Sequence, residues 1–180
     1  PRGVTTRLGV VGHVGYEGLE DILGFLASEA TAMGYSLAYE GDLAAIAPRG
    51  ATRLGHPSQV DTLITLGGDG TLIRAARFLG GADVPIFGVN LGKLGFLTTC
   101  QGEEFPEAFR RFAAGGHNVQ TRMALEARTW TPSGALGIQV RALNDVVVHK
   151  GGYARVLRMK LSAGDEPIAN LAADGVVVAT

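Results

Sequence analysis

The first two thirds of the chain alternate two kinds of hydrophobic pattern. Short runs of consecutive apolar residues, typical of buried strands, stand at residues 7–12, 35–40, 60–66 and 84–90. Between and after them, segments with apolar residues three or four positions apart are typical of amphipathic helices, at residues 16–33, 71–79 and 103–116. Strands that alternate with helices predict a parallel sheet with helices on both faces.

The pattern changes after His117. The runs that follow are strand-like, with turn signals such as TPSG and AGDEP between them: LEARTW, GIQVRALNDVVVH, RVLRMKLSA and GVVVAT. No convincing helical pattern occurs in this part. The sequence therefore predicts an α/β fold in two domains: a Rossmann-like domain with a parallel sheet at residues 1–116, and the first strands of an all-β domain at residues 117–180.

The composition of the chain limits the kinds of molecule that it is expected to bind. The chain of 180 residues is 46% hydrophobic with a formal net charge of -1, which gives no broad electrostatic attraction to nucleic acid or to an acidic membrane surface. No apolar run approaches the roughly 20 residues that span a bilayer. Cys100 is the single cysteine, so no intramolecular disulfide can form and no zinc spacing exists. We expect a cytoplasmic protein that binds neither nucleic acid nor membranes.

The segment LITLGGDGTLIRAAR combines a strand, a tight turn and a helix. A helix N-terminus presents unpaired N–H groups, and Gly67, Gly68 and Gly70 would let a bulky anion approach that backbone. Asp69 does not belong in a plain phosphate cradle, because a carboxylate repels phosphate unless a metal intervenes or the acid handles a proton. Phosphoryl transfer to a hydroxyl needs such a group. This turn therefore predicts a kinase-like site with Asp69 as its catalytic residue.

Two further residues of this segment have expected roles. The Thr71 hydroxyl would cap the helix, and Arg74, one turn further, would reach a phosphate. An ordinary glycine turn, in which Asp69 only stabilises the helix dipole, also fits a bare Gly-Asp-Gly. The segments GVNLGKLG and GVVGHVG lack the spacing of the P-loop and of the dinucleotide-binding motif, so we interpret them as tight turns.

Four motifs occur in an order that resembles NAD kinases: LGGDGTLIRAAR, PIFGVNLGKLGFLT, LNDVVVHKGG and ADGVVVAT. The resemblance runs from about Arg7 to Thr180. The superfamily of NAD kinases also includes diacylglycerol and sphingosine kinases and 6-phosphofructokinases, and the GGDGT block is common to it. The NLGKLGFL and LNDVVVHKGG segments resemble NAD kinases more closely than the lipid kinases.

The resemblance implies an enzyme that transfers a phosphoryl group from ATP or inorganic polyphosphate to the 2′-hydroxyl of the adenosine ribose of NAD, giving NADP. Asp69 would accept the proton of that hydroxyl, and Gly70 would line the site. Mg²⁺ would come mainly with the donor phosphates, because this ion keeps several of its waters. The family also implies a homodimer or a homotetramer.

The same resemblance implies five further residues of the binding site. Phe96 would lie against the substrate, Asn144 and Asp145 would hold a purine edge or ribose, Arg155 would contact ligand from a neighbouring subunit, and Asp174 would approach the substrate. Taken alone, the same residues have ordinary alternatives: a core phenylalanine, a solvated turn before a strand, and a surface charge.

Three departures from the family pattern stand out. Asp145 is one methylene shorter than the usual Glu, and Ala172 stands where many members carry Arg. The chain ends before the PTGSTAY stretch with which the family continues, so the resemblance implies an incomplete second domain, part of the NAD pocket absent, and an inactive fragment as one outcome. A lipid kinase of the same superfamily and a non-catalytic NAD-binding module are the alternative functions.

Overall fold

The computed structural model of the chain describes residues 6–48, 51–93, 95–152 and 156–180. The chain divides into two compact units, Pro1–Val119 and Gln120–Thr180, which we describe in turn. The boundary expected from the sequence lies at residues 116 and 117. Within the described ranges, every helix is too short or too polar to cross a membrane.

The first unit is built on a six-stranded sheet in which every neighbouring pair is parallel, in the order β3-β2-β1-β4-β5-β6. Its strands are β1 (Arg7–Gly12), β2 (Ser36–Tyr39), β3 (Thr52–Arg53), β4 (Thr62–Gly67), β5 (Ile86–Asn90) and β6 (Cys100–Gln101). The sheet confirms the predicted α/β class. The two-residue strands β3 and β6 are too short to leave a hydrophobic pattern, and the sequence analysis missed them.

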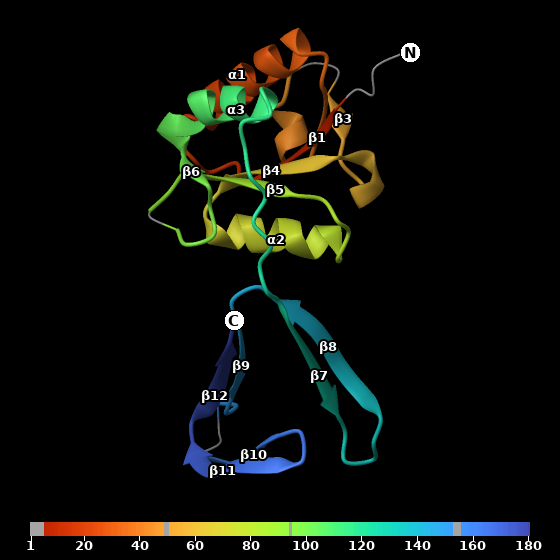
Figure 1. The fold of residues 1–180 in the computed structure, drawn as a ribbon, viewed down its shortest axis with the longest axis vertical. Coiled ribbons are helices and arrows are strands. Elements are labelled where there is room, and N and C mark those ends of the chain that lie inside the picture. Colours follow the sequence, from red (N-terminus) through yellow and green to blue (C-terminus); the bar gives the residue numbers. More distant parts are fainter. Residues whose placement is uncertain (1–5, 49–50, 94, 153–155) are drawn as a thin grey trace. The chain divides into compact units, whose positions relative to one another are not determined.

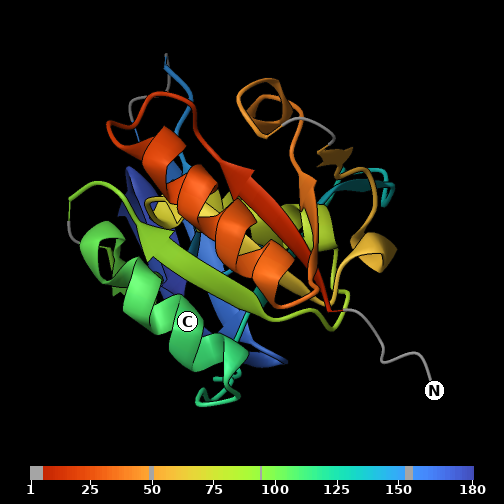
Figure 2. The same ribbon diagram turned by 90° about the horizontal axis from the view of Figure 1, so that it is seen from above.

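Helices cover both faces of this sheet. Figure 1 shows α1 (Leu19–Ala32) and α3 (Phe105–Ala113) on one face and α2 (Asp69–Leu79) on the other, and Figure 2 shows α1 and α3 lying side by side over the strands. Three short 3₁₀ turns complete the unit: η1 (Leu43–Ala45), η2 (Pro57–Gln59) and η3 (Gly102–Glu104). Helix α1 begins at Leu19 rather than near residue 16, because Gly18 adopts a left-handed conformation with φ of 74°.

Two hydrophobic clusters fix the layers. On one face, Leu23 and Leu26 of α1 pack with Phe105 and Phe109 of α3, all of them at most 1% exposed. On the other face, Ala75 of α2 belongs to a smaller cluster with residues of β1 and β4. Each fully buried leucine or phenylalanine contributes about 1.5–3 kcal/mol. The central strands β1 and β4 are therefore buried between the two helical layers.

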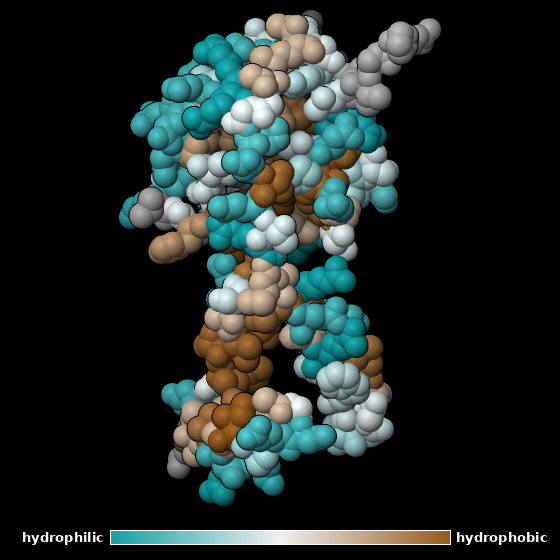
Figure 3. All heavy atoms as spheres, viewed as in Figure 1, coloured by the Kyte–Doolittle hydropathy of each residue, from teal (hydrophilic) through white to brown (hydrophobic). Residues whose placement is uncertain are grey.

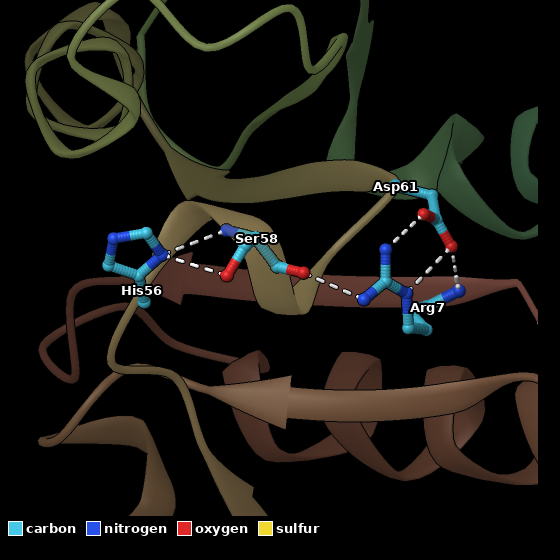
Figure 4. A network of polar contacts seen from close by, with 4 residues as sticks. All are labelled: Arg7, His56, Ser58 and Asp61. Carbon is cyan, nitrogen blue, oxygen red and sulfur yellow. Dashed lines mark hydrogen bonds and ion pairs between the residues drawn. The ribbon is translucent and has the colours of Figure 1, made fainter.

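A polar network joins the start of β1 to the segment before β4 (Figure 4). The Arg7 guanidinium donates to both carboxylate oxygens of Asp61, at 2.6 Å and 3.2 Å, and to the carbonyl oxygen of Ser58 at 2.7 Å. The His56 ring Nδ1 accepts from the Ser58 N–H at 3.2 Å. The hydrogen bond from Arg7 holds the pKa of Asp61 below its usual range.

The second unit consists of three antiparallel strand pairs, β7-β8, β9-β12 and β10-β11. Its strands are β7 (Leu125–Trp130), β8 (Leu136–Ala142), β9 (Asp145–His149), β10 (Leu157–Ala163), β11 (Glu166–Ala173) and β12 (Gly175–Ala179). The strand-like run at 137–149 is divided into β8 and β9, and β11 was not foreseen. Val147 and Val148 of β9 and Val177 and Val178 of β12 are about half exposed, and Figure 3 shows apolar residues gathered there.

Candidate active site

The candidate site lies at the carboxyl edge of the parallel sheet. The chain passes from β1 to β2 on one side, and β4 pairs with β1 on the other side, so the strand order reverses at β1. Ligands of open α/β sheets bind in the crevice that such a reversal leaves at the carboxyl ends of the strands. The glycine-rich turn after β4 lies at this edge.

Asp69 is the first residue of α2, which follows the N-cap residue Gly68. Its carboxylate accepts two backbone hydrogen bonds: Oδ2 from the Phe96 N–H at 2.9 Å and Oδ1 from the Leu97 N–H at 3.0 Å. The side chain is partly exposed. A carboxylate has about four acceptor positions, so each oxygen keeps one for a ligand. The N–H groups of residues 96 and 97 thus orient the Asp69 carboxylate and leave it acceptor positions for a ligand.

The glycines of the turn have different reasons for being glycine. A Cβ on Gly67 would lie 2.3 Å from Thr71 Oγ1, which no real side chain tolerates. A Cβ on Gly68 would lie 4.0 Å from both Tyr16 Oη and Asn90 Oδ1, so these two polar groups border the turn. Gly70 is exposed, and no atom lies within 4 Å of the place that a Cβ would take; its contact with a ligand stays a prediction.

Thr71 does not have the expected capping role. Helix α2 starts two residues earlier than the sequence indicated, at Asp69, and no side-chain hydrogen bond caps it. Thr71 is therefore the third helical residue, and its side chain is buried against Gly67. The prediction of a Thr71 cap is wrong, because the helix begins directly after Gly68, two residues before the apolar pattern begins.

Arg74 is engaged by protein groups at the same edge. Its Nη1 forms an ion pair with Glu40 Oε1 at 2.5 Å, and its Nη2 donates to the Gly12 carbonyl oxygen at 2.8 Å. Glu40 follows β2, and Gly12 ends β1. The guanidinium therefore ties α2 to the ends of two strands. Contact with a phosphate stays a prediction.

Phe96 projects from the loop that holds Asp69. Its side chain is 84% exposed, while its backbone N–H donates to the carboxylate. The alternative of a core phenylalanine is therefore wrong. An exposed aromatic ring beside an oriented acid is available to pack against a flat ligand such as a purine.

Sequence reasoning missed three residues that shape this edge. Asn90 ends β5 with 1% exposure, Tyr16 borders Gly68, and Glu40 pairs with Arg74. The signal for Asn90 was present, since it opens the NLGKLGFL motif directly after a buried strand. Tyr16 and Glu40 carried no signal, because their contacts join segments far apart in the chain.

The remaining candidate residues belong to the second unit. Asn144 and Asp145 are exposed at the start of β9, where the Asn144 carbonyl accepts from the Thr180 N–H at 2.8 Å. Asp174 lies at the opposite end of the β9-β12 ribbon and forms an ion pair with Lys150 at 2.8 Å.

Four residue steps separate the two ends of this ribbon, or about 13 Å at the rise of a strand. The ribbon therefore keeps Asp174 apart from Asn144 and Asp145. Arg155 lies outside the described residues. Across the described residues, no three His, Cys, Asp or Glu side chains gather closely enough to hold a metal ion.

Comparisons with known proteins give a consistent result. Residues 22–117 match the family model of the ATP-NAD kinase N-terminal domain. The chain is 43% identical over 174 residues to an NAD kinase of Gemmatimonas aurantiaca, covering 97% of this chain and 60% of the relative. It is 41% identical over 143 residues to an NAD kinase of Symbiobacterium thermophilum, covering 74% of this chain and 50% of the relative.

The fold matches a solved structure as well. The crystal structure of yeast NADH kinase in complex with NADH superposes with a TM-score of 0.83 over 99% of this chain and 55% of the yeast chain, at 20% sequence identity. At this identity the match establishes the fold alone. The chain thus spans between half and 60% of the length of these relatives.

Proposed function

Because this chain belongs to the NAD kinase family, we propose that the protein phosphorylates the 2′-hydroxyl of the adenosine ribose of NAD to give NADP. The donor is ATP or inorganic polyphosphate. The observation that carries the proposal is the Asp69 carboxylate, oriented by two N–H groups at the N-terminus of α2 and partly open to solvent.

In the proposed reaction the ribose 2′-oxygen forms a bond to the terminal phosphorus of the donor. The bond from that phosphorus to the bridging oxygen breaks, and the electron pair leaves with ADP or with the shortened polyphosphate. Asp69 accepts the proton of the 2′-hydroxyl. Transfer of this kind depends mainly on positioning and on electrostatic stabilisation, which suits a fixed carboxylate beside free helix N–H groups.

The other residues of the site have supporting roles in this proposal. Gly68 and Gly70 keep the backbone open to phosphate, whereas the buried Gly67 makes room for Thr71. The exposed Phe96 ring packs against the nucleotide. Asn144 and Asp145, with Asp174, supply amide and carboxylate groups for purine and ribose hydroxyls. Arg74 contacts a donor phosphate once it exchanges its bond with Glu40.

Mg²⁺ fits this site as a companion of the donor. A Mg²⁺ ion that keeps several waters and binds donor phosphates needs no cage of protein ligands. When bound to the donor, the ion neutralises phosphate charge. Asp69 is the carboxylate of the turn that would contact the ion through water.

The test is the Asp69→Asn variant of the full-length protein, assayed for NADP formation with ATP and with polyphosphate. Asparagine keeps the shape of the side chain but does not accept a proton. We expect turnover to fall by on the order of 10² or more while NAD affinity changes little. Unchanged turnover would remove Asp69 from the chemistry.

Asp83→Asn is the matched control, because Asp83 is an exposed carboxylate in the same unit after α2. It should leave turnover unaltered. The wild-type protein is also tested for phosphorylation of diacylglycerol in vesicles, and its binding of NAD is measured separately from turnover. Lipid phosphorylation would favour the lipid kinase alternative, and NAD binding without any turnover would favour the non-catalytic module.

A further inference from the structure

Asn90 is a polar side chain in an apolar place. It ends β5 with 1% exposure, next to Val89, which is fully buried in the larger hydrophobic cluster. Burying an amide without hydrogen bonds costs roughly 1–3 kcal/mol in proteins. The hydrogen bonds of the buried Asn90 amide therefore matter for the local structure.

Both ends of the Asn90 amide are used within the next three residues. Nδ2 donates to the Lys93 carbonyl oxygen at 2.6 Å, and Oδ1 accepts from the Gly92 N–H at 3.1 Å. The Leu91 N–H in turn donates to the Gly67 carbonyl oxygen at 3.2 Å. The amide therefore fixes the direction in which the chain leaves β5, beside the glycine-rich turn.

The same segment reaches Asp69 a few residues later. The N–H groups of Phe96 and Leu97 hold the two carboxylate oxygens, at 2.9 Å and 3.0 Å. The loop after β5 is thus tied to the sheet at its start by Asn90 and to the carboxylate at its end. Lys93, which the amide holds, and Phe96, which donates to the carboxylate, are only three residues apart in the chain, so a shift at the start of the loop has a short covalent path to the two N–H donors.

We propose that Asn90 is a positioning residue for Asp69, which acts by setting the path of the loop whose backbone N–H groups orient that carboxylate. The geometric part of this inference stands on the hydrogen bonds alone, whereas its effect on turnover rests on the proposed function. Asn90 touches neither substrate nor reacting atoms in this role.

An amide is the group that this place requires. The position needs one donor and one acceptor on a short planar side chain, which Asn supplies. Aspartate would put a carboxylate oxygen against the Lys93 carbonyl oxygen in place of the 2.6 Å donor bond, and alanine would lose both bonds. Serine retains a hydroxyl that can donate or accept, but it ends one bond before the amide atoms, so it is the milder of the two truncations.

The first experiment measures amide hydrogen exchange by NMR in wild type, Asn90→Ala and Asn90→Ser. We expect the protection of the Phe96 and Leu97 amides to fall about tenfold or more in the alanine variant, and less in the serine variant. Amides of β5 such as Val89 report whether each variant is folded. Unchanged protection at residues 96 and 97 in a folded variant would overturn the proposal.

Asn118→Ala is the matched control, since Asn118 is exposed and outside the sheet. It should leave the amides of Phe96 and Leu97 as protected as in wild type. If neither Asn90 variant folds, the same exchange is measured in Asp69→Ala. In that variant we expect the amides of residues 96 and 97 to lose protection while the Gly92 amide stays protected. Unchanged protection at residues 96 and 97 would contradict the proposal.

The second experiment compares turnover in the full-length protein for Asn90→Ala, Asp69→Asn and the double variant. We expect Asn90→Ala to lower kcat about tenfold with the KM for NAD nearly unchanged. If Asn90 acts through Asp69, the double variant loses no more turnover than Asp69→Asn alone. Additive losses would show an independent structural role.

The two experiments separate the failure of this inference from the failure of the proposed function. If Asp69→Asn kept full turnover while the exchange data held, the kinase mechanism would fall and the positioning of the carboxylate would stand.

Discussion

Gly95 lies so close to Asp69 that a Cβ on residue 95 would stand 2.5 Å from the carboxylate Oδ1. The same Cβ would be 3.1 Å from Thr98 Oγ1, so it has no easy direction in which to yield. Glycine at this position is what lets the loop bring its N–H groups onto the acid.

Gly95→Ala should therefore displace either the loop or the carboxylate. Under the proposed function, we expect NADP formation by the full-length protein to fall about tenfold or more, because a small misplacement of the proton-accepting acid would be costly. Gly92→Ala is the control in the same loop, since its Cβ would meet Tyr16 Cε1 at an ordinary 3.5 Å. Equal activity of the two variants would contradict this explanation.

Arg74→Ala should lower the free energy of unfolding. The guanidinium is partly exposed, so its ion pair with Glu40 contributes little, but the bond to the Gly12 carbonyl adds to it. We expect a loss of about 1 kcal/mol in urea unfolding of the first unit. Arg122→Ala, an exposed arginine outside the helices, should change stability by less than about 0.5 kcal/mol.

The Arg7–Asp61 pair predicts a pH dependence of stability. The pKa of Asp61 is lower in the folded protein than its ordinary value of 3.8, so the charged carboxylate stabilises the fold above that pH. This stabilisation is lost as the pH falls through the depressed pKa. Urea unfolding of wild type and Asp61→Asn should therefore differ at pH 7, and the difference should shrink as the pH falls below 3.8. A constant difference across this range would contradict the prediction.

Tyr39→Phe should leave stability unchanged or raise it by up to about 1 kcal/mol. The ring is 2% exposed, and among the described residues its hydroxyl has no hydrogen-bond partner. Burial also raises the pKa of Tyr39. Tyr35→Phe is the contrasting variant, because the Tyr35 hydroxyl donates to the Ala113 carbonyl oxygen, and it should lose stability. Thermal unfolding of wild type and both variants measures these changes, and a loss of stability in Tyr39→Phe as large as in Tyr35→Phe would contradict the prediction.

The hydrophobic pattern predicted the main architecture because burial on both sides of a parallel sheet leaves continuous apolar runs. Strands β1, β4 and β5 and the three helices occur in the predicted regions, with their ends shifted by up to three residues. Strand β11 was missed, since EPIANLAA combines proline and asparagine with weak alternation. The break between β8 and β9 depends on a turn at Leu143 and Asn144 that the apolar run conceals.

Only the part of the site that depends on particular side chains could be predicted from the sequence. Asp69 and the glycines around it form a recognisable sequence motif, so the turn was predicted. The partners of the carboxylate are backbone N–H groups of residues 96 and 97, which every residue except proline possesses. Their position follows from Asn90 and Gly95, and that relation becomes visible only when β4 and β5 lie side by side.

The backbone origin of the two donors to Asp69 has an evolutionary consequence. Side chains at residues 96 and 97 are free to drift among most amino acids without loosening the acid, and proline at either position is the exception. Substitutions at residues 96 and 97 can thus change the exposed surface of the loop, while the two backbone donors to Asp69 are retained.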